Sequence, residues 1–155
     1  MESLSVFDLL VMHDLVADLP ARWLHRLAGA GCSVRAPAGQ RLIREDADAD
    51  RFWLVHRGTV GLDFHVPGHG DIFFGQARAG SLVGWSWLRP PYRWTCGAVV
   101  TEDIHAVEFE ADAVRRLMAE DPALAHSLGL RVLDVVAERL VEARHRLVEW
   151  YAFPG

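Results

Sequence analysis

The chain has 155 residues, of which 51% are hydrophobic and 24% charged, so it can bury the core of one globular domain without disulfide or metal staples. Its formal net charge is −5 and all 16 basic residues are arginines, so it lacks the lysine that Schiff-base catalysis and a GxxxxGK phosphate loop require. An acidic chain without a basic cluster repels nucleic acid. No apolar run reaches the roughly 18 residues that cross a bilayer, and no basic leader follows Met1, so we expect a cytoplasmic protein.

Residues 3–29 predict two short helices. Apolar residues recur at helical spacing from Val6 through His13 to Leu19, and Pro20 is suited to open a second helix. The second helix carries Trp23, Leu24 and Leu27 and is followed by Gly29 and Gly31.

Residues 33–109 alternate apolar and polar positions, and turn residues interrupt them at short intervals. These turn residues are Pro37, Gly39, Gly58, Pro67, Gly68, Gly70, Gly80, Gly84, Pro90 and Pro91. Several short strands at such spacing predict an antiparallel barrel or sandwich. Since no Ser/Gly-rich linker separates the zones, we expect residues 1–155 to form a single domain.

The two cysteines, Cys32 and Cys96, stand far apart and form no CxxC pair. They lack the dense, even spacing of a disulfide framework. We expect both thiols to be reduced and buried.

Residues 110–151 predict two further helices. Glu110 and Asp112 suit the start of a short helix because the helix dipole favours acidic residues there. Asp121 and Pro122 then start a long helix that runs to about Tyr151.

The second half of this long helix carries a narrow apolar seam. It consists of Leu133, Leu140 and Leu147, spaced by seven, and of Val136, Ala143 and Trp150, three positions further on. A seam of this period suits a partner helix, although it also suits packing on the chain's own barrel. We expect the upstream half to pack on the barrel and residues 133–150 to form a homodimer, so that the dimer contact lies within residues 122–151.

The order of short helices, β-barrel and long C-terminal helix resembles the cyclic nucleotide-binding domain of catabolite-activator (Crp-Fnr) regulators and of cyclic-nucleotide-gated kinases and channels, over about residues 20–151. The matching segments are Pro37–Gln40, Leu42–Asp46, Phe52–Val55 and Arg57–Val60. The resemblance implies an α+β fold: an antiparallel β-roll, or jelly-roll barrel, between short N-terminal helices and a long C-terminal dimerisation helix. Because the chain ends at Gly155 without a helix-turn-helix domain, we expect a short stand-alone bacterial member that does not bind DNA directly.

Gly80–Leu88 resembles the cassette whose backbone N–H groups hold the cyclic phosphate in that family. In the family a glutamate after the second glycine accepts from the ribose 2′-hydroxyl. Trp85 stands at this position, and an indole has one donor and no acceptor. An arginine further on pairs with the phosphate in the family. Arg93 is the best candidate for it and Arg89 the next.

The candidate ligand-binding residues are Gly84, Trp85, Ser86, Trp87, Arg93, Trp94 and Thr95. The aromatic rings of Trp85, Trp87, Tyr92 and Trp94 can form a wall for a planar ligand or fill the barrel. Arg93 can also stack between Tyr92 and Trp94. The first hypothesis is a non-enzymatic ligand-sensing domain that binds a small anion, first cyclic AMP or cyclic GMP, and signals through its last helix to a protein partner. The alternative is a ligand-free interaction module whose pocket is closed by Trp85 or Trp87.

Two enzymatic readings have less support. His56, His65, His69 and His105 lie in the β zone, but no HxH pair with a following glutamate is present, so a cupin-type metal site is not expected. Ser86 lacks the second glycine of a GxSxG nucleophile turn and is better suited to cap a helix or to bind an anion. We therefore expect no enzyme and no metal.

Overall fold

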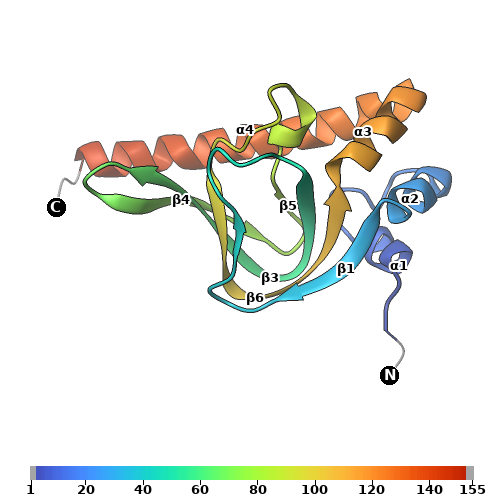
Figure 1. Ribbon diagram of the computed structural model, residues 1–155, viewed down its shortest axis with the longest axis horizontal. Coiled ribbons are helices and arrows are strands. Elements are labelled where there is room, and N and C mark those ends of the chain that lie inside the picture. The colour runs from blue at the N-terminus through green and yellow to red at the C-terminus, as the bar shows by residue number, and fades with distance from the viewer. Residues whose placement is uncertain (1–2, 153–155) are drawn as a thin grey trace.

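A computed structural model describes residues 3–152, in which six antiparallel strands curl into a β-roll beside a long C-terminal helix (Figure 1). This arrangement confirms the α+β fold, with short N-terminal helices ahead of the roll. The elements are α1 (Val6–Val11), α2 (Ala21–Ala28), β1 (Gly31–Ala36), β2 (Arg41–Ile43), β3 (Arg51–Val66), β4 (Gly70–Arg78), β5 (Leu82–Val83), the 3₁₀ turn η1 (Ser86–Leu88), β6 (Gly97–Glu110), α3 (Ala111–Glu120) and α4 (Pro122–Ala152).

The two longest strands, β3 and β6, pair with each other and carry the rest of the sheet. β6 also pairs with β1 and β2, and β3 also pairs with β4 and β5. The β3–β6 register shifts near Gly58, which has a φ of +89°, and a Cβ there would press on the backbone carbonyl of Asp103. The predicted glycine turn is therefore a bend that only glycine fits at this close approach.

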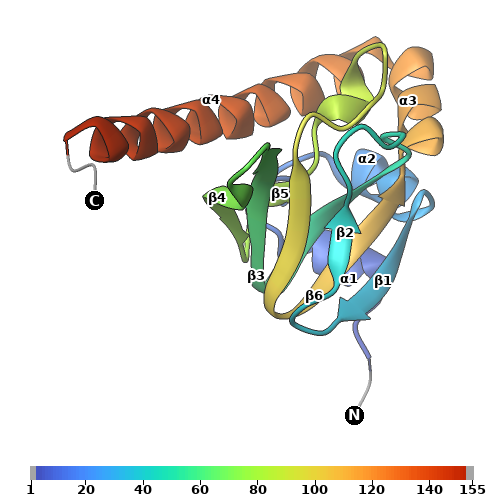
Figure 2. The ribbon, with the colours of Figure 1, turned by 60° about the vertical axis from the view of Figure 1, so that its left-hand side comes forward.

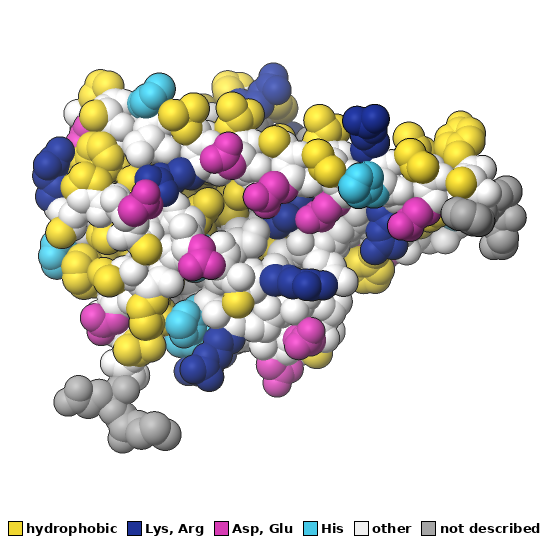
Figure 3. Space-filling view, turned by 180° about the vertical axis from the view of Figure 1, so that it is seen from behind, with side chains coloured by type: hydrophobic (Ala, Val, Ile, Leu, Met, Phe, Trp, Pro, Cys, Tyr) yellow, Lys and Arg dark blue, Asp and Glu magenta, His cyan; other side chains and the backbone are white. Residues whose placement is uncertain are grey.

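The first half of α4 packs on the roll, and its second half extends beyond it over the β3–β4 hairpin (Figure 2). Leu124, Leu128, Val132 and Val135 are buried, whereas Leu140 and Leu147 are exposed. Apolar side chains continue along the edge of α4 to its C-terminal end (Figure 3). The upstream half thus packs on the roll, as expected, and most of the predicted seam faces solvent.

Arg139 fastens α4 to the roll at the boundary between these halves. Its side chain is only 5% exposed, and its guanidinium donates to Ser81 Oγ (2.9 Å) and to the Leu82 carbonyl (3.3 Å). Burial lowers the pKa of Arg139, and Glu142, at 3.6 Å, opposes that shift. The guanidinium therefore fixes the position of the helix relative to β5 and to the turn that precedes it.

The N-terminal helix is shorter than predicted. α1 ends at Val11, and residues 12–19 form turns rather than continuing the helix to Leu19. The reason is His13, which is 4% exposed: its Nδ1 accepts from the Leu15 N–H (3.2 Å), and its Nε2 lies 3.0 Å from the Val55 carbonyl. These bonds turn the chain inward onto β3, and they require a neutral imidazole that carries its proton on Nε2.

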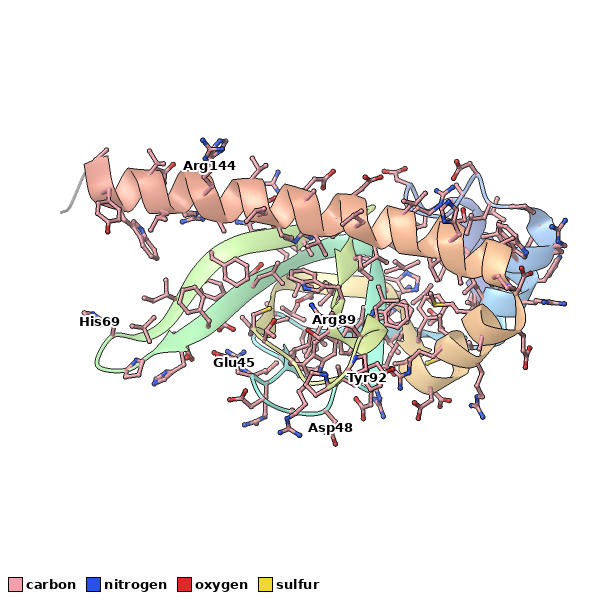
Figure 4. All side chains as sticks on the ribbon, turned by 90° about the horizontal axis from the view of Figure 1, so that it is seen from above. Glu45, Asp48, His69, Arg89, Tyr92 and Arg144 are labelled. Carbon is pink, nitrogen blue, oxygen red and sulfur yellow. The ribbon has the colours of Figure 1, made fainter. Side chains whose placement is uncertain are left out.

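The buried His13 makes the stability of the fold dependent on pH. Burial lowers the pKa of His13 below its value in the unfolded chain, about 6.5. Above that pH the neutral imidazole makes its full contribution to the free energy of unfolding, and this contribution is lost as the pH falls below it. Urea unfolding at pH 7.5 and 5.5 should show a loss of stability that is smaller in His13→Gln, which keeps the donor to Val55. His69→Gln, at the exposed tip of the β3–β4 hairpin, should behave like the unmodified chain (Figure 4).

His105 adds to the same trend, because burial and the nearby Arg35 lower its pKa as well. A pH dependence in His13→Gln equal to that of the unmodified chain would therefore assign the whole effect to other histidines and contradict the prediction.

The cysteine prediction is wrong for one of the two residues. Cys32 is exposed, because β1 lies at the edge of the sheet and turns this side chain outward toward Glu108. Cys96 is half-buried, and burial raises the pKa of its thiol to about 11. Both thiols are free.

Candidate functional site

The segment between β5 and β6, residues 84–96, forms a cassette that is anchored to the core by Trp87. This side chain has no exposed surface, its ring stacks on Phe52 with centroids 4.0 Å apart, and its Nε1 donates to the Gly84 carbonyl (2.9 Å). Phe52 in turn stacks on Phe109 (4.8 Å). Trp87 therefore belongs to the core and does not close a pocket at the surface.

Trp94 fills the roll directly beneath the start of the cassette. Gly84 has a φ of +96°, and a Cβ there would lie 2.5 Å from the Trp94 ring, which is itself 5% exposed. The tight curl predicted at Gly84 is present, and it exists because the backbone passes over an indole. No room for a ligand remains between these two residues.

The helix α3 holds the outer end of the cassette. Arg115 donates to the Trp87 carbonyl (2.7 Å), pairs with Asp112, and lies over the Tyr92 ring at 4.3 Å. Tyr92, predicted as a wall or filling residue, lies at the surface instead. These contacts keep the loop after η1 against the helices.

Arg93 turns toward the β2–β3 loop. Its guanidinium donates to Asp48 Oδ1 (3.1 Å) and to the Asp46 carbonyl, and residues 48 and 93 form an isolated β-bridge. Figure 4 shows Asp48 and Tyr92 on neighbouring loops, which a bond from the Ala49 N–H to the Tyr92 carbonyl (2.7 Å) joins. The Arg93–Asp48 pair is exposed, and such pairs contribute about 0 to 1 kcal/mol, so an anion with two acceptor oxygens can compete with Asp48.

A cavity of about 510 Å³ lies between the cassette and α4; we call it the cassette cavity. Two exposed arginines, Arg89 and Arg93, line it, and no carboxylate does. Neither the Arg89 guanidinium nor the Ser86 hydroxyl bonds to any residue in the described range 3–152. The remaining lining residues are Trp85, Leu88, Pro90, Pro91, Thr95, Gly129, Val132, Leu133 and Val136. In a chain of net charge −5, this cavity is suited to an anion.

The structure divides the seven predicted ligand-binding residues into two groups. Trp85, Ser86, Arg93 and Thr95 line the cassette cavity. Gly84, Trp87 and Trp94 are buried next to it. Ser86 begins η1 but does not cap it, since the residue before the turn is Trp85 and no side-chain cap bond is present there.

Sequence reasoning missed the wall that α4 contributes to this cavity. Leu133 and Val136 were assigned to the helix seam alone, yet both line the cavity together with Gly129 and Val132. One residue in the sequence could have indicated this wall: Gly129 is small and stands where α4 faces the cassette. The contact itself joins segments about 40 positions apart and has no local pattern.

The histidines of the β zone lie in separate places or pair with other groups. His105 Nε2 lies 2.7 Å from Ser33 Oγ, and its ring meets His56 edge-on at 5.3 Å, while His65 pairs with Asp71. Within residues 3–152, no three His, Cys, Asp or Glu side chains form a group that could hold a metal. None of the helices in that range is long and apolar enough to cross a membrane.

Residues 33–121 match the family model of the cyclic nucleotide-binding domain. A putative cyclic nucleotide-binding protein from Geobacter metallireducens is similar in structure, with 25% identity and a TM-score of 0.77, over 89% of this chain and 99% of that one. A cyclic nucleotide-binding domain from Methylobacillus flagellatus has 19% identity and a TM-score of 0.76 over 93% and 81%.

The regulatory domain of Toxoplasma gondii PKA, solved with cAMP, has 17% identity and a TM-score of 0.63 over 72% of this chain and 42% of that one. Comparison with curated protein sequences finds no match.

Proposed function

Because the chain belongs to the cyclic nucleotide-binding domain family, a family of ligand-sensing regulators, we propose that its cassette cavity binds a small organic anion and that α4 transmits the binding. The observation that carries this proposal is an open cavity of about 510 Å³ with two arginines and no carboxylate in its wall. This volume lies in the usual range for small-molecule sites, about 300 to 1,000 Å³.

A cyclic nucleotide is the first ligand to test. Trp85 cannot accept a hydrogen bond from a ribose hydroxyl, but the Ser86 and Thr95 hydroxyls line the same cavity and can accept one. The Trp85 ring offers a flat apolar surface to a purine. Arg89 and Arg93 provide the bidentate donors that a cyclic phosphate requires.

The output of the domain is carried by α4. Val132 and Val136 line the cavity, and the exposed seam continues on the same helix to Trp150. A ligand shifts the helix only by the difference in its affinity for two helix positions. We propose that this shift acts on a homodimer formed through α4, or on a protein partner that docks there.

The competing function is a ligand-free interaction module. One observation favours it: Trp94 occupies the space beneath Gly84, at the start of residues 84–96. In that case the cassette cavity is only a surface hollow, and α4 serves for dimerisation alone.

Calorimetric titration of cyclic AMP, and then of cyclic GMP, distinguishes the two functions. We expect saturable heat from at least one nucleotide and at least about a 10-fold loss of affinity in Arg89→Ala and in Arg93→Ala, because each removes a charge-assisted hydrogen bond worth about 1.5 to 3 kcal/mol. Arg57→Ala is the matched control, since Arg57 is exposed on β3 and does not line the cassette cavity. No heat from either nucleotide would support the ligand-free module.

A further inference from the structure

Beyond Trp85 lies a second cavity, of about 380 Å³, between the β3–β4 hairpin and the C-terminal half of α4; we call it the aromatic cavity. Its lining residues are Phe64, Phe74, Trp85, Thr95, Cys96, Ala143, Arg146, Leu147 and Trp150. It shares Trp85 and Thr95 with the cassette cavity, so the Trp85 indole stands between the two.

The chemistry of the aromatic cavity excludes a strongly polar guest. Apart from Arg146, its side-chain hydrogen-bonding groups are the Thr95 hydroxyl, the indole N–H groups of Trp85 and Trp150, and the Cys96 thiol, which burial keeps neutral by raising its pKa to about 11. A nucleotide placed there would leave several donors and acceptors without partners, each at a cost of about 1 to 3 kcal/mol. Four aromatic rings instead favour a flat apolar body.

The charge at the rim of this cavity is positive. Arg146 is exposed and makes no hydrogen bond or ion pair with another residue of the described range 3–152. Glu142, one turn earlier on α4, pairs with Arg139 instead. Glu142 and Glu149 line a separate polar groove, of which Arg146 forms the border, and neither lines the aromatic cavity.

Two carboxylates, those of Asp63 and Glu45, add to the raised pKa of Cys96, but neither lines the aromatic cavity. Asp63 is 2% exposed and held by two bonds from Arg41, at 2.7 and 3.0 Å. Its charge is therefore already compensated, and Arg146 is the charge that a guest in the aromatic cavity meets.

From this lining we propose that the aromatic cavity binds an organic anion with a flat apolar body, of the aromatic carboxylate or sulfonate class, whose charged group pairs with Arg146. The proposal does not depend on the cassette, because Arg89, Arg93 and Ser86 do not line this cavity. Three seam residues, Ala143, Leu147 and Trp150, also line this cavity, so a second helix that packs on that part of the seam would compete with the anion. Leu133 and Leu140 lie outside the lining, so a helix contact there leaves the cavity open.

The test compares two fluorescent probes that differ in charge: 8-anilinonaphthalene-1-sulfonate and its neutral analogue N-phenyl-1-naphthylamine. We expect one saturable sulfonate site per chain, with about a 10-fold loss of affinity for the sulfonate in Arg146→Gln and no change for the neutral probe. Arg144→Gln is the matched control, since Arg144 points away from the hairpin (Figure 4) and does not line the aromatic cavity. Equal behaviour of the two variants would overturn the role of Arg146.

A variant that fills the cavity tests the location of the site. Ala143→Phe places a ring in the aromatic cavity and should weaken both probes at least 10-fold, with an unchanged circular dichroism spectrum. Arg93→Ala should leave both affinities unchanged, so failure of the cassette proposal and failure of this one give different results. Undiminished binding in a folded Ala143→Phe variant would place the probe elsewhere and overturn the proposal.

Discussion

For the homodimer that we propose through α4, replacement of Leu140 by glutamate is expected to give a monomer at concentrations where the unmodified chain forms that dimer. Leu140 lies at the centre of the seam and is 70% exposed, so most of its side chain is not covered by the described residues of its own chain. In a two-fold dimer the change acts twice, and each copy loses about 1.5 to 3 kcal/mol of apolar burial, so the dissociation constant should rise at least about 100-fold. Sedimentation equilibrium over a concentration series measures it.

Val141→Glu provides the matched control. Val141 is 50% exposed on the same helix, about 100° around the axis from Leu140 and outside the seam of Leu133, Leu140 and Leu147. It should remain a dimer with a dissociation constant near that of the unmodified chain. If Val141→Glu dissociates and Leu140→Glu does not, the helix pairs through another face and the seam prediction is wrong.

Local patterns were enough to predict the elements of this fold. Pro122 starts α4, the glycine at position 58 bends β3, and the seven-residue spacing of Leu133, Leu140 and Leu147 marks positions that are exposed in the single chain. Each of these follows from residues within one or two turns of the chain. Helix starts, positive φ angles and periodic faces are local properties, and the sequence displays them directly.

The partners of the site residues were not predictable in the same way. Arg93 pairs with Asp48, 45 positions earlier, and nothing near Arg93 indicates that partner. His13 likewise ends α1 because of a bond to Val55 on β3, which helical spacing alone does not reveal. Contacts of this kind depend on which strands and loops the fold brings together.

The aromatic residues of the cassette show most clearly what the sequence alone could not predict. Trp85 and Trp87 are two positions apart and chemically identical, yet one lines two cavities and the other has no exposed surface. The 3₁₀ turn separates their directions, and its placement against Phe52 decides which ring enters the core. The sequence allowed two roles for these rings, lining a ligand pocket or filling the core. Trp85 takes the first role and Trp87 the second.

Trp87→Ala is expected to destabilise the fold by about 3 to 5 kcal/mol, the range for removing a large buried aromatic side chain. The change leaves Phe52 without its stacking partner, removes the bond to the Gly84 carbonyl, and opens a cavity that the surrounding strands cannot easily close. Because stabilities of single domains are about 5 to 15 kcal/mol, the midpoint in urea should fall sharply.

Two further variants separate the contributions of Trp87. Trp87→Phe keeps a ring against Phe52 but loses the Nε1 donor, so its loss of stability should be clearly smaller than that of Trp87→Ala. Tyr92→Ala, at a surface ring that packs on Arg115, should cost about 1 kcal/mol or less. If Trp87→Ala costs no more than Tyr92→Ala, the cassette is not anchored through Trp87, and the cassette cavity loses the rigid floor on which ligand binding depends.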